Sequence, residues 1–255
     1  MGFDLEVLPS AALAAEAAAR KFLLAANDAI RLRGEFVVAL SGGATPRSLY
    51  QRLAAEPFAS SLDWSRVQVL WGDERCVPPA HEASNYRIAR ETLLDAVPVL
   101  ETHLHRIHGE GDPSEAAAGY QRVVRAVLRT PAGPPRTVSG YRIDLVLLGL
   151  GLDGHTASLF PGSPRVHRTS SWVVAEDVPA VPPRRVTMTP IVLNAAADIV
   201  FLVSGGAKAA ILRQVLEGPH RPNDLPAQAI RPTAGRALWL VDAAAAADLG
   251  RAAGR

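Results

Sequence analysis

The sequence has a single cysteine, Cys76, and few aromatic residues, which make up 5% of its 255 residues. One cysteine excludes a disulfide within the chain and a cysteine-rich metal site. No uncharged apolar run reaches the roughly 18 residues of a membrane span. The amino terminus, MGFDLEVLPS, lacks the basic start and apolar stretch of a signal peptide. These absences predict a soluble protein of the cytoplasm, with no membrane partner.

An excess of charge of one sign is also missing. The chain carries 27 Lys and Arg residues against 25 Asp and Glu residues, a formal net charge of +2. No block of basic residues stands out, so the sequence does not indicate a nucleic-acid partner. Hydrophobic residues make up 48% of the chain, as is typical of a globular protein. We expect one domain that spans residues 1–255; a homo-oligomer is compatible with this composition, and the oligomeric state stays open.

Apolar segments alternate with segments of helical periodicity along most of the chain. The expected strands are 35–40, 67–71, 143–150, 172–175, 185–189, 199–204 and 237–241, and the expected helices are 10–33, 45–54, 85–97, 113–128 and 207–216. Nearly continuous apolar strands that alternate with helices are typical of a parallel sheet covered on both faces. The sequence therefore predicts a doubly wound, mostly parallel, Rossmann-like α/β fold. Its binding site should lie at the carboxyl ends of the strands.

The stretch SGGATP follows the first of these strands. Ser41 ends the apolar run, Gly42 and Gly43 follow, and Thr45 is expected to cap a helix whose first residue is Pro46. Glycines let the backbone approach an anion, and the first amides of the helix attract it. This pattern predicts a phosphate-binding loop, although an ordinary strand-to-helix turn would also contain glycines.

Two cationic residues occupy similar places later in the chain. Lys208 lies in SGGAK, between a strand and the start of a helix, and Arg185 lies where another strand begins. Two helix starts marked by glycines, each near a cation or a hydroxyl, indicate a phosphorylated small molecule. The glycines of SGGAK could equally serve only the turn.

Three charged residues, Asp73, Glu74 and Arg75, come directly after the strand VQVLW, which we expect to be central in the sheet. Folds of this class place their binding site at such strand ends. A solvated loop is the alternative, since charged tripeptides are common in loops.

The stretch LGLGLDGHTASLF admits two interpretations. Gly149, Gly151 and Gly154 match the G-x-G-x-x-G spacing of a dinucleotide-binding loop. However, Asp153 would put a carboxylate beside the pyrophosphate, and the prolines of FPGSP would break the long helix that should follow. The sequence therefore favours a catalytic loop over a cofactor site, and we expect no cofactor.

His155 follows Asp153 by two residues, just after the most apolar strand. A carboxylate at that distance can orient an imidazole, which can then act as a general base near neutral pH. A structural histidine with an ordinary aspartate cap is the alternative. Another group of histidines, His103, His105 and His108, has no common helix or strand face, so we expect a surface loop there and no metal.

Several of these motifs occur together, and in the same order, in one known family. The motifs are SGGATPRSLY, WGDERCVPP with ASNYRIARETLL, GLGLDGHTASLFPGSP, RRVTMTPIVLNAA and SGGAKAAIL. The chain resembles the 6-phosphogluconolactonases over nearly its whole length, and the DGHTASLFP element is the most specific. This family resembles the glucosamine-6-phosphate deaminases and ribose-5-phosphate isomerases in fold. The resemblance implies a metal-free enzyme of the pentose phosphate pathway that hydrolyses 6-phospho-D-glucono-1,5-lactone, a phosphorylated sugar lactone, to 6-phosphogluconate.

The resemblance also implies roles for individual residues. The phosphate site would comprise Ser41, Gly42, Gly43, Thr45, Arg185 and Lys208. His155 would be the catalytic base with Asp153 beside it, while Asp73 and Arg75 would line the sugar end of a cleft that also holds Asn85. Arg184 neighbours Arg185, and strand alternation lets only one of them face the phosphate.

Two other functions are compatible with this kind of fold. In the deaminases an acid precedes the proline where this chain has Phe160, and an aromatic residue stands where it has Arg75. Both differences favour the lactonase, because ring opening needs an acid near the ring oxygen. A sugar-phosphate sensor of a transcriptional regulator would need a DNA-binding segment, and no helix-turn-helix precedes Ser41.

Overall fold

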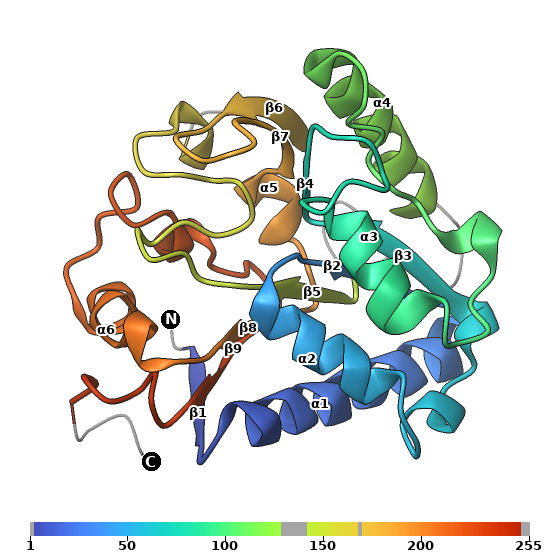
Figure 1. Ribbon diagram of the computed structural model, residues 1–255, viewed down its shortest axis with the longest axis horizontal. Helices are drawn as coiled ribbons and strands as arrows, with labels where there is room; N and C mark the ends of the chain where they lie inside the picture. Colours follow the sequence, from blue (N-terminus) through green and yellow to red (C-terminus); the bar gives the residue numbers. More distant parts are fainter. Residues whose placement is uncertain (1–2, 129–141, 168–169, 251–255) are drawn as a thin grey trace.

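A computed structural model describes residues 3–128, 142–167 and 170–250. Its largest sheet has six strands in the order β1-β9-β8-β5-β2-β3, and every neighbouring pair is parallel (Figure 1). The strands are β1 (Asp4–Leu8), β2 (Phe36–Leu40), β3 (Val67–Trp71), β5 (Leu145–Leu148), β8 (Asp198–Val203) and β9 (Arg236–Asp242). The predicted mostly parallel α/β fold is confirmed.

The sequence did not predict β1, and its burial explains why. All five residues of this edge strand are exposed or half-buried, so the segment lacks the continuous apolar run that marks β2 or β5. It pairs with β9, from Asp4 opposite Leu238 to Leu8 opposite Asp242.

A second, antiparallel sheet of three strands was also not predicted. It has the order β4-β7-β6, with β4 (Asp73–Arg75), β7 (Arg184–Met188) and β6 (Val173–Asp177). The charged triplet after β3 is therefore a strand rather than a loop. β3 itself is an edge strand of the parallel sheet, so the expectation of a central strand was wrong.

Gly72 connects the two sheets. Its backbone N–H donates to the carbonyl of Leu40 in the parallel sheet, at 2.8 Å, and its carbonyl accepts from the N–H of Met188 in the antiparallel sheet, also at 2.8 Å. The chain thus passes from β3 to β4 through one residue that is bonded to both sheets. This connection sets Asp73 and Arg75 beside the carboxyl end of β2.

The helices largely follow the predicted periodicity. They are α1 (Ala11–Arg33), α2 (Ala44–Leu53), α3 (Asn85–Ala89), α4 (Pro113–Leu128), α5 (Pro190–Leu193) and α6 (Ala209–Glu217). Ser10 caps α1 as predicted, because its side chain accepts from the N–H of Leu13. The helix expected at 85–97 is shorter, since α3 continues into a π-helical turn, Arg90–Leu94, and ends. No helix within the described ranges is long and apolar enough to cross a bilayer.

Packing of the helices differs between the two sheets. α1 lies along β2, β8 and β9 and buries a face rich in alanine, including Ala14, Ala18 and Ala26. Small side chains let a helix approach a sheet closely. α4 instead lies against β6 and β7 of the antiparallel sheet (Figure 1). The prolines and glycines of residues 130–140 predict a surface loop, and this segment lies outside the described residues.

Candidate active site

A cleft of about 610 Å³ lies at the carboxyl ends of the parallel strands, a size that suits a small-molecule site. Segments that follow β2, β3, β5 and β8 line it. Ten predicted site residues are among its lining residues: Ser41, Gly42, Gly43, Thr45, Asp73, Arg75, Asn85, Asp153, His155 and Lys208. The structure therefore brings together residues that are distant in the sequence.

The loop between β2 and α2 matches an anion site in part. α2 begins at Ala44 with Gly43 as its N-cap, and no side chain caps it. The expectation that Thr45 caps this helix was wrong, because Thr45 already lies within its first turn. Gly43 has φ of 107°, which favours glycine. Uncapped first-turn amides are available to an anion in the cleft.

Gly42 lies in close contact with the side chain of Asn85. A Cβ atom at this position would overlap the Asn85 carboxamide. Only glycine therefore lets this loop pass directly beside α3. Asn85 in turn donates from Nδ2 to the backbone carbonyl of Asp73, at 2.9 Å, so one amide group lies between the phosphate-loop candidate and β4.

Several polar atoms at or next to the cleft are buried without a partner. Within the described ranges, these are Ser41 Oγ, Arg75 Nε, Asn85 Oδ1 and Arg185 Nε. An unsatisfied buried polar group costs about 1–3 kcal/mol, so native proteins seldom gather several in one place. Two guanidinium donors and a hydroxyl in such a group are the chemistry that would hold an anionic ligand.

Arg75 and Arg185 lie side by side in the antiparallel sheet. They are paired residues of β4 and β7, and Arg185 is only 5% exposed. Arg184, the preceding residue, is exposed, so strand alternation turns Arg185 towards the interior. Burial lowers the pKa of Arg185, the charge of Arg75 lowers it further, and the Asp73 carboxylate opposes both. Arg185 is not among the lining residues of the cleft, whereas Arg75, its cross-strand neighbour, is.

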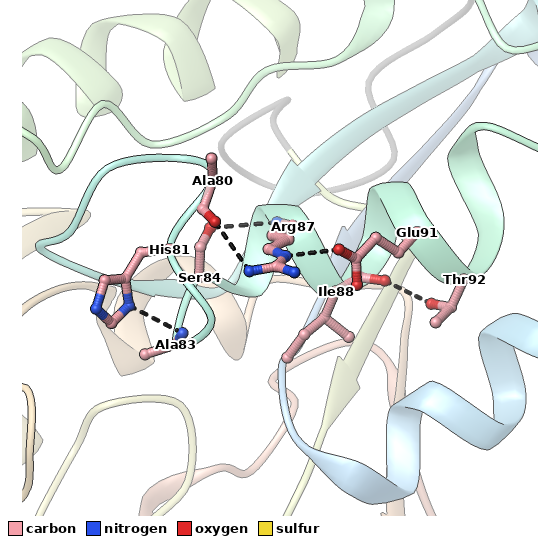
Figure 2. Close-up of polar contacts among 8 residues, drawn as sticks. All are labelled: Ala80, His81, Ala83, Ser84, Arg87, Ile88, Glu91 and Thr92. Carbon is pink, nitrogen blue, oxygen red and sulfur yellow. Dashed lines mark hydrogen bonds and ion pairs between the residues drawn. The ribbon is translucent and has the colours of Figure 1, made fainter.

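A short loop before α3 holds Arg75 from the other side. Arg75 donates from Nη1 to the carbonyl of Ala83, at 2.6 Å. Figure 2 shows how this loop is fixed: the Arg87 side chain reaches back to the carbonyl of Ala80, at 3.0 Å, and Ser84 Oγ accepts from the N–H of Arg87, at 3.2 Å. The position of the Arg75 guanidinium therefore depends on the start of α3.

Glu74 is a buried carboxylate that the sequence singled out only as part of a charged triplet. Its Oε1 accepts from the backbone N–H groups of Arg75 and Asn85, at 2.8 and 2.7 Å. Its Oε2 accepts from the N–H of Tyr86 and the hydroxyl of Ser84, at 2.8 and 3.0 Å. Burial raises the pKa of Glu74, and the backbone hydrogen bonds counteract that rise. This carboxylate anchors the first turn of α3 to β4.

Asp73 is also bonded at both carboxylate oxygens. Oδ2 accepts from the hydroxyl of Ser158, at 2.6 Å, and Oδ1 accepts from Nδ2 of Asn85, at 3.3 Å. Both Asp73 and Ser158 are buried. Asp73 therefore links β4, α3 and the segment after β5, and the sequence did not single out Ser158.

Replacing Ser158 by alanine should lower the free energy of unfolding by about 1.5–3 kcal/mol, the usual contribution of a hydrogen bond to a buried charge. Ser65→Ala is a matched control, because Ser65 Oγ donates to Asp63 at 2.5 Å on the exposed surface. Urea denaturation of both variants would measure the difference. Equal losses in the two variants would contradict a special contribution from the buried bond.

His155 and Asp153 form a pair at the tight turn after β5. Asp153 Oδ1 accepts from the ring Nδ1 of His155, at 2.6 Å, and from its backbone N–H, at 3.1 Å. Burial alone would raise the pKa of Asp153, but the hydrogen bonds and charge of His155 outweigh it and hold that pKa below its ordinary value. The ring also stacks on Phe160, with centroids 4.1 Å apart. Nδ1 is thus engaged by the carboxylate, and Nε2 remains for other chemistry.

Glycines allow this turn to form. A Cβ at Gly151 would overlap the His155 ring, and Gly154 has φ of 84°. A 3₁₀ turn, Pro164–Val166, follows at a short distance in place of a long helix. This confirms the expectation that the prolines exclude the crossover helix of a dinucleotide-binding unit.

Lys208 lies in a 3₁₀ turn, Gly206–Lys208, directly before α6. Burial lowers the pKa of Lys208, and the Asp153 carboxylate counteracts that effect. Lys208 therefore lies near Asp153 and lines the same cleft. Its charge can serve an anion bound between the two helix starts.

The three histidines of the predicted surface loop differ in exposure, since His103 and His105 are half-buried and His108 is exposed. His105 Nε2 contacts Gln68 Oε1 at 2.7 Å, and burial lowers the pKa of His105. His108 is exposed beside Glu110. In the part of the chain that the structure describes, no three His, Cys, Asp or Glu side chains gather in a way that could hold a metal ion.

Comparisons with known proteins show the family of the chain. A family model described as glucosamine-6-phosphate isomerases/6-phosphogluconolactonase matches residues 9–239. The chain belongs to this family. Membership makes it an enzyme, as the resemblance in the sequence implied.

Three relatives illustrate the similarity. The chain is 36% identical over 226 residues to probable 6-phosphogluconolactonase 2 of Oryza sativa subsp. indica, covering 86% of this chain and 80% of the relative. It is 35% identical over 232 residues to probable 6-phosphogluconolactonase 1 of Arabidopsis thaliana, covering 87% and 84%. The solved 6-phosphogluconolactonase from Trypanosoma cruzi superposes with a TM-score of 0.83 at 27% identity, covering 97% of each chain.

Proposed function

We propose that this enzyme is a lactone hydrolase that converts 6-phospho-D-glucono-1,5-lactone to 6-phospho-D-gluconate, in the cytoplasm and within the oxidative pentose phosphate pathway. The observation that carries this proposal is the Asp153–His155 pair, which lines the same cleft as an uncapped helix start and Arg75. A base and anion-binding groups that line the same cleft suit a phosphorylated ester. The names of the relatives support this substrate.

His155 is the general base of the proposed reaction. Its Nδ1–H donates to Asp153, so Nε2 takes a proton from water as the water oxygen forms a bond to the C1 carbonyl. The tetrahedral intermediate then breaks the bond between C1 and the ring oxygen, and the imidazolium returns the proton to that oxygen. Asp153 keeps the ring oriented and stabilises its charged form. No proton is gained or lost by the enzyme over the cycle.

Arg75 stabilises the oxyanion that develops at C1. Its guanidinium is fixed by the Ala83 carbonyl, and its Nε is buried without a partner. Preorganised donors of this kind need no rearrangement in the transition state. Asp73, with both oxygens bonded, contributes by holding Asn85 and the segment after β5 in place.

The phosphate binds between the two helix starts. Ser41, Gly42, Gly43 and Thr45 supply backbone and hydroxyl donors, and Lys208 supplies charge from the opposite side. Arg185 supports the site from beside Arg75, its cross-strand neighbour, since it does not itself line the cleft. Anchoring the phosphate positions C1 beside His155, which can lower the barrier by several kcal/mol.

Phe160 disfavours the deaminase alternative. Its ring stacks on His155 and lines the cleft, at the place where ring opening would need an acid. A phenyl group cannot donate a proton to a ring oxygen. Incubation with freshly generated lactone, corrected for spontaneous hydrolysis, tests the proposed reaction; loss at the uncatalysed rate would rule it out.

Lys208→Ala should raise KM roughly 10- to 100-fold and leave kcat nearly unchanged, because a charged hydrogen bond to the phosphate contributes about 1.5–3 kcal/mol. The lowered pKa of Lys208 means that its ammonium group loses its proton at a lower pH than an ordinary lysine does. Because the neutral amine no longer attracts the phosphate, affinity for 6-phosphogluconate should fall as pH rises through that range. Calorimetric titration across that range would show the fall. Lys21→Ala, an exposed change on α1, is the control, and an unchanged KM for Lys208→Ala would remove that residue from the phosphate site.

A further inference from the structure

Two of the four tyrosines make the same unusual contact at the cleft end of neighbouring strands. The Tyr50 hydroxyl accepts from the backbone N–H of Ser41, at 3.0 Å, and donates to the carbonyl of Ser41, at 2.6 Å. The Tyr120 hydroxyl accepts from the N–H of Trp71, at 2.7 Å, and donates to its carbonyl, at 3.0 Å. Each phenol hydroxyl thus forms hydrogen bonds with both the backbone N–H and the backbone carbonyl of one residue.

Both contacts occur where backbone groups have no hydrogen-bonding partner in a neighbouring strand of the parallel sheet. The pairing of β2 with β3 ends at Leu40 opposite Trp71, and Ser41 lies one residue beyond it. β3 is an edge strand, so one side of Trp71 has no neighbouring strand of this sheet. A buried backbone group without a partner is costly, and the two phenols remove that cost at both positions.

The chemistry of the two phenols suits this function. Burial raises the pKa of Tyr50 and of Tyr120 far above the ordinary value, with backbone hydrogen bonds only partly opposing it. Both are therefore neutral, and only a neutral phenol can accept and donate at the same time. Tyr50 and Tyr120 are both fully or nearly fully buried, so water does not compete for these bonds.

The segments that follow the two contacts carry different parts of the site. Ser41 leads into Gly42 and Gly43 and the first turn of α2. Trp71 leads through Gly72 into Asp73 and Arg75. The two phenols come from different helices, Tyr50 from α2 and Tyr120 from α4.

We propose that Tyr50 and Tyr120 are positioning residues, Tyr50 for the phosphate loop and Tyr120 for the segment that carries Arg75. This inference rests on the proposed function. Tyr50 fixes the peptide planes from which the anion-binding amides begin, so it affects ground-state binding. Tyr120 fixes the start of the segment that stabilises the oxyanion, so it affects the transition state.

The test compares Tyr50→Phe with Tyr120→Phe, which remove one oxygen atom each from equivalent contacts. Tyr50→Phe should raise KM for the lactone and Kd for 6-phosphogluconate by roughly 2- to 10-fold, the effect of one hydrogen bond, with kcat little changed. Tyr120→Phe should lower kcat by a similar factor and leave KM and Kd unchanged. Both should lower the melting temperature to a similar extent, so a general loss of stability predicts the same kinetic change in both variants.

Identical kinetic changes, or lower stability with unchanged kinetics, would overturn the inference. If wild type does not hydrolyse the lactone, the proposed function fails. The positioning roles are then tested by binding of 6-phosphogluconate and of inorganic phosphate alone. In that test Tyr50→Phe must bind these ligands more weakly than wild type, and Tyr120→Phe must bind them equally well. If wild type binds neither 6-phosphogluconate nor inorganic phosphate, the inference about the two tyrosines is also overturned.

Hydrogen exchange of the wild-type enzyme provides a check that needs no variant. The amides of Ser41 and Trp71 should exchange as slowly as those within β2. Rapid exchange at either position would show that the corresponding phenol does not hold the backbone.

Discussion

Replacing His155 by alanine should lower kcat by roughly 10²–10⁴-fold, the usual contribution of a general base. Affinity for 6-phosphogluconate should stay nearly unchanged, because the phosphate end of the cleft does not depend on the imidazole. Stopped assays with freshly generated lactone, corrected for spontaneous hydrolysis, measure kcat, and calorimetry measures the affinity.

His108→Ala is the control for that experiment, since the His108 side chain is exposed and its charged neighbour, Glu110, does not line the cleft. It should retain wild-type kinetics. If His155→Ala kept full kcat, the Asp153–His155 pair would be a structural element of the turn, which is the alternative that the sequence left open. A variant that lost affinity together with kcat would indicate a displaced loop, and its thermal unfolding would reveal that.

Replacing Arg75 by alanine should lower kcat by roughly 10²–10³-fold, as removal of an oxyanion donor does in other enzymes. The reason lies in its fixed position: one nitrogen is held by the Ala83 carbonyl and another is buried without a partner. Arg184→Ala is the matched control, because Arg184 is exposed. Steady-state kinetics of the two variants at equal protein concentration would separate them.

A different outcome for Arg75 has a clear meaning. Raised KM with unchanged kcat would show that Arg75 binds sugar hydroxyls in the ground state instead of the oxyanion. Arg75→Lys adds a further distinction, since lysine keeps the charge but loses the planar donor group. Equal activity of the lysine variant and wild type would show that charge alone suffices.

The parts of the fold with local signals could be predicted from the sequence. The bounds of α4 agree with the expected helix, Pro113–Leu128, because its apolar residues recur at helical spacing and proline begins it. β2 and β5 are buried along their whole length, which produces the apolar runs that mark them. The half-exposed β1 and the charged β4 have no such run, and neither was predicted. That residues 1–255 form one domain stays a prediction.

The candidate site shows the same division. Glycine-rich loops and the Asp153–His155 spacing are local, and they were found. Ser158 was missed because its partner, Asp73, is 85 residues away in the sequence. Tyr120 and Trp71 are 49 residues apart, and nothing in the pattern of either segment indicates that they meet. Residues that hold a site together depend on the folded contacts, whereas residues that react carry recognisable chemistry.

The connection at Gly72 has a consequence for how this protein can be redesigned. The two sheets are joined there by main-chain atoms on both sides, so the joint depends on the path of the chain rather than on a particular side chain. A Cβ at this position would lie 3.6 Å from the Leu40 carbonyl oxygen, an ordinary contact. Libraries of variants with substitutions in the strands on either side of Gly72 can therefore change the residues that line the cleft. The relative orientation of the two sheets should stay the same in these variants.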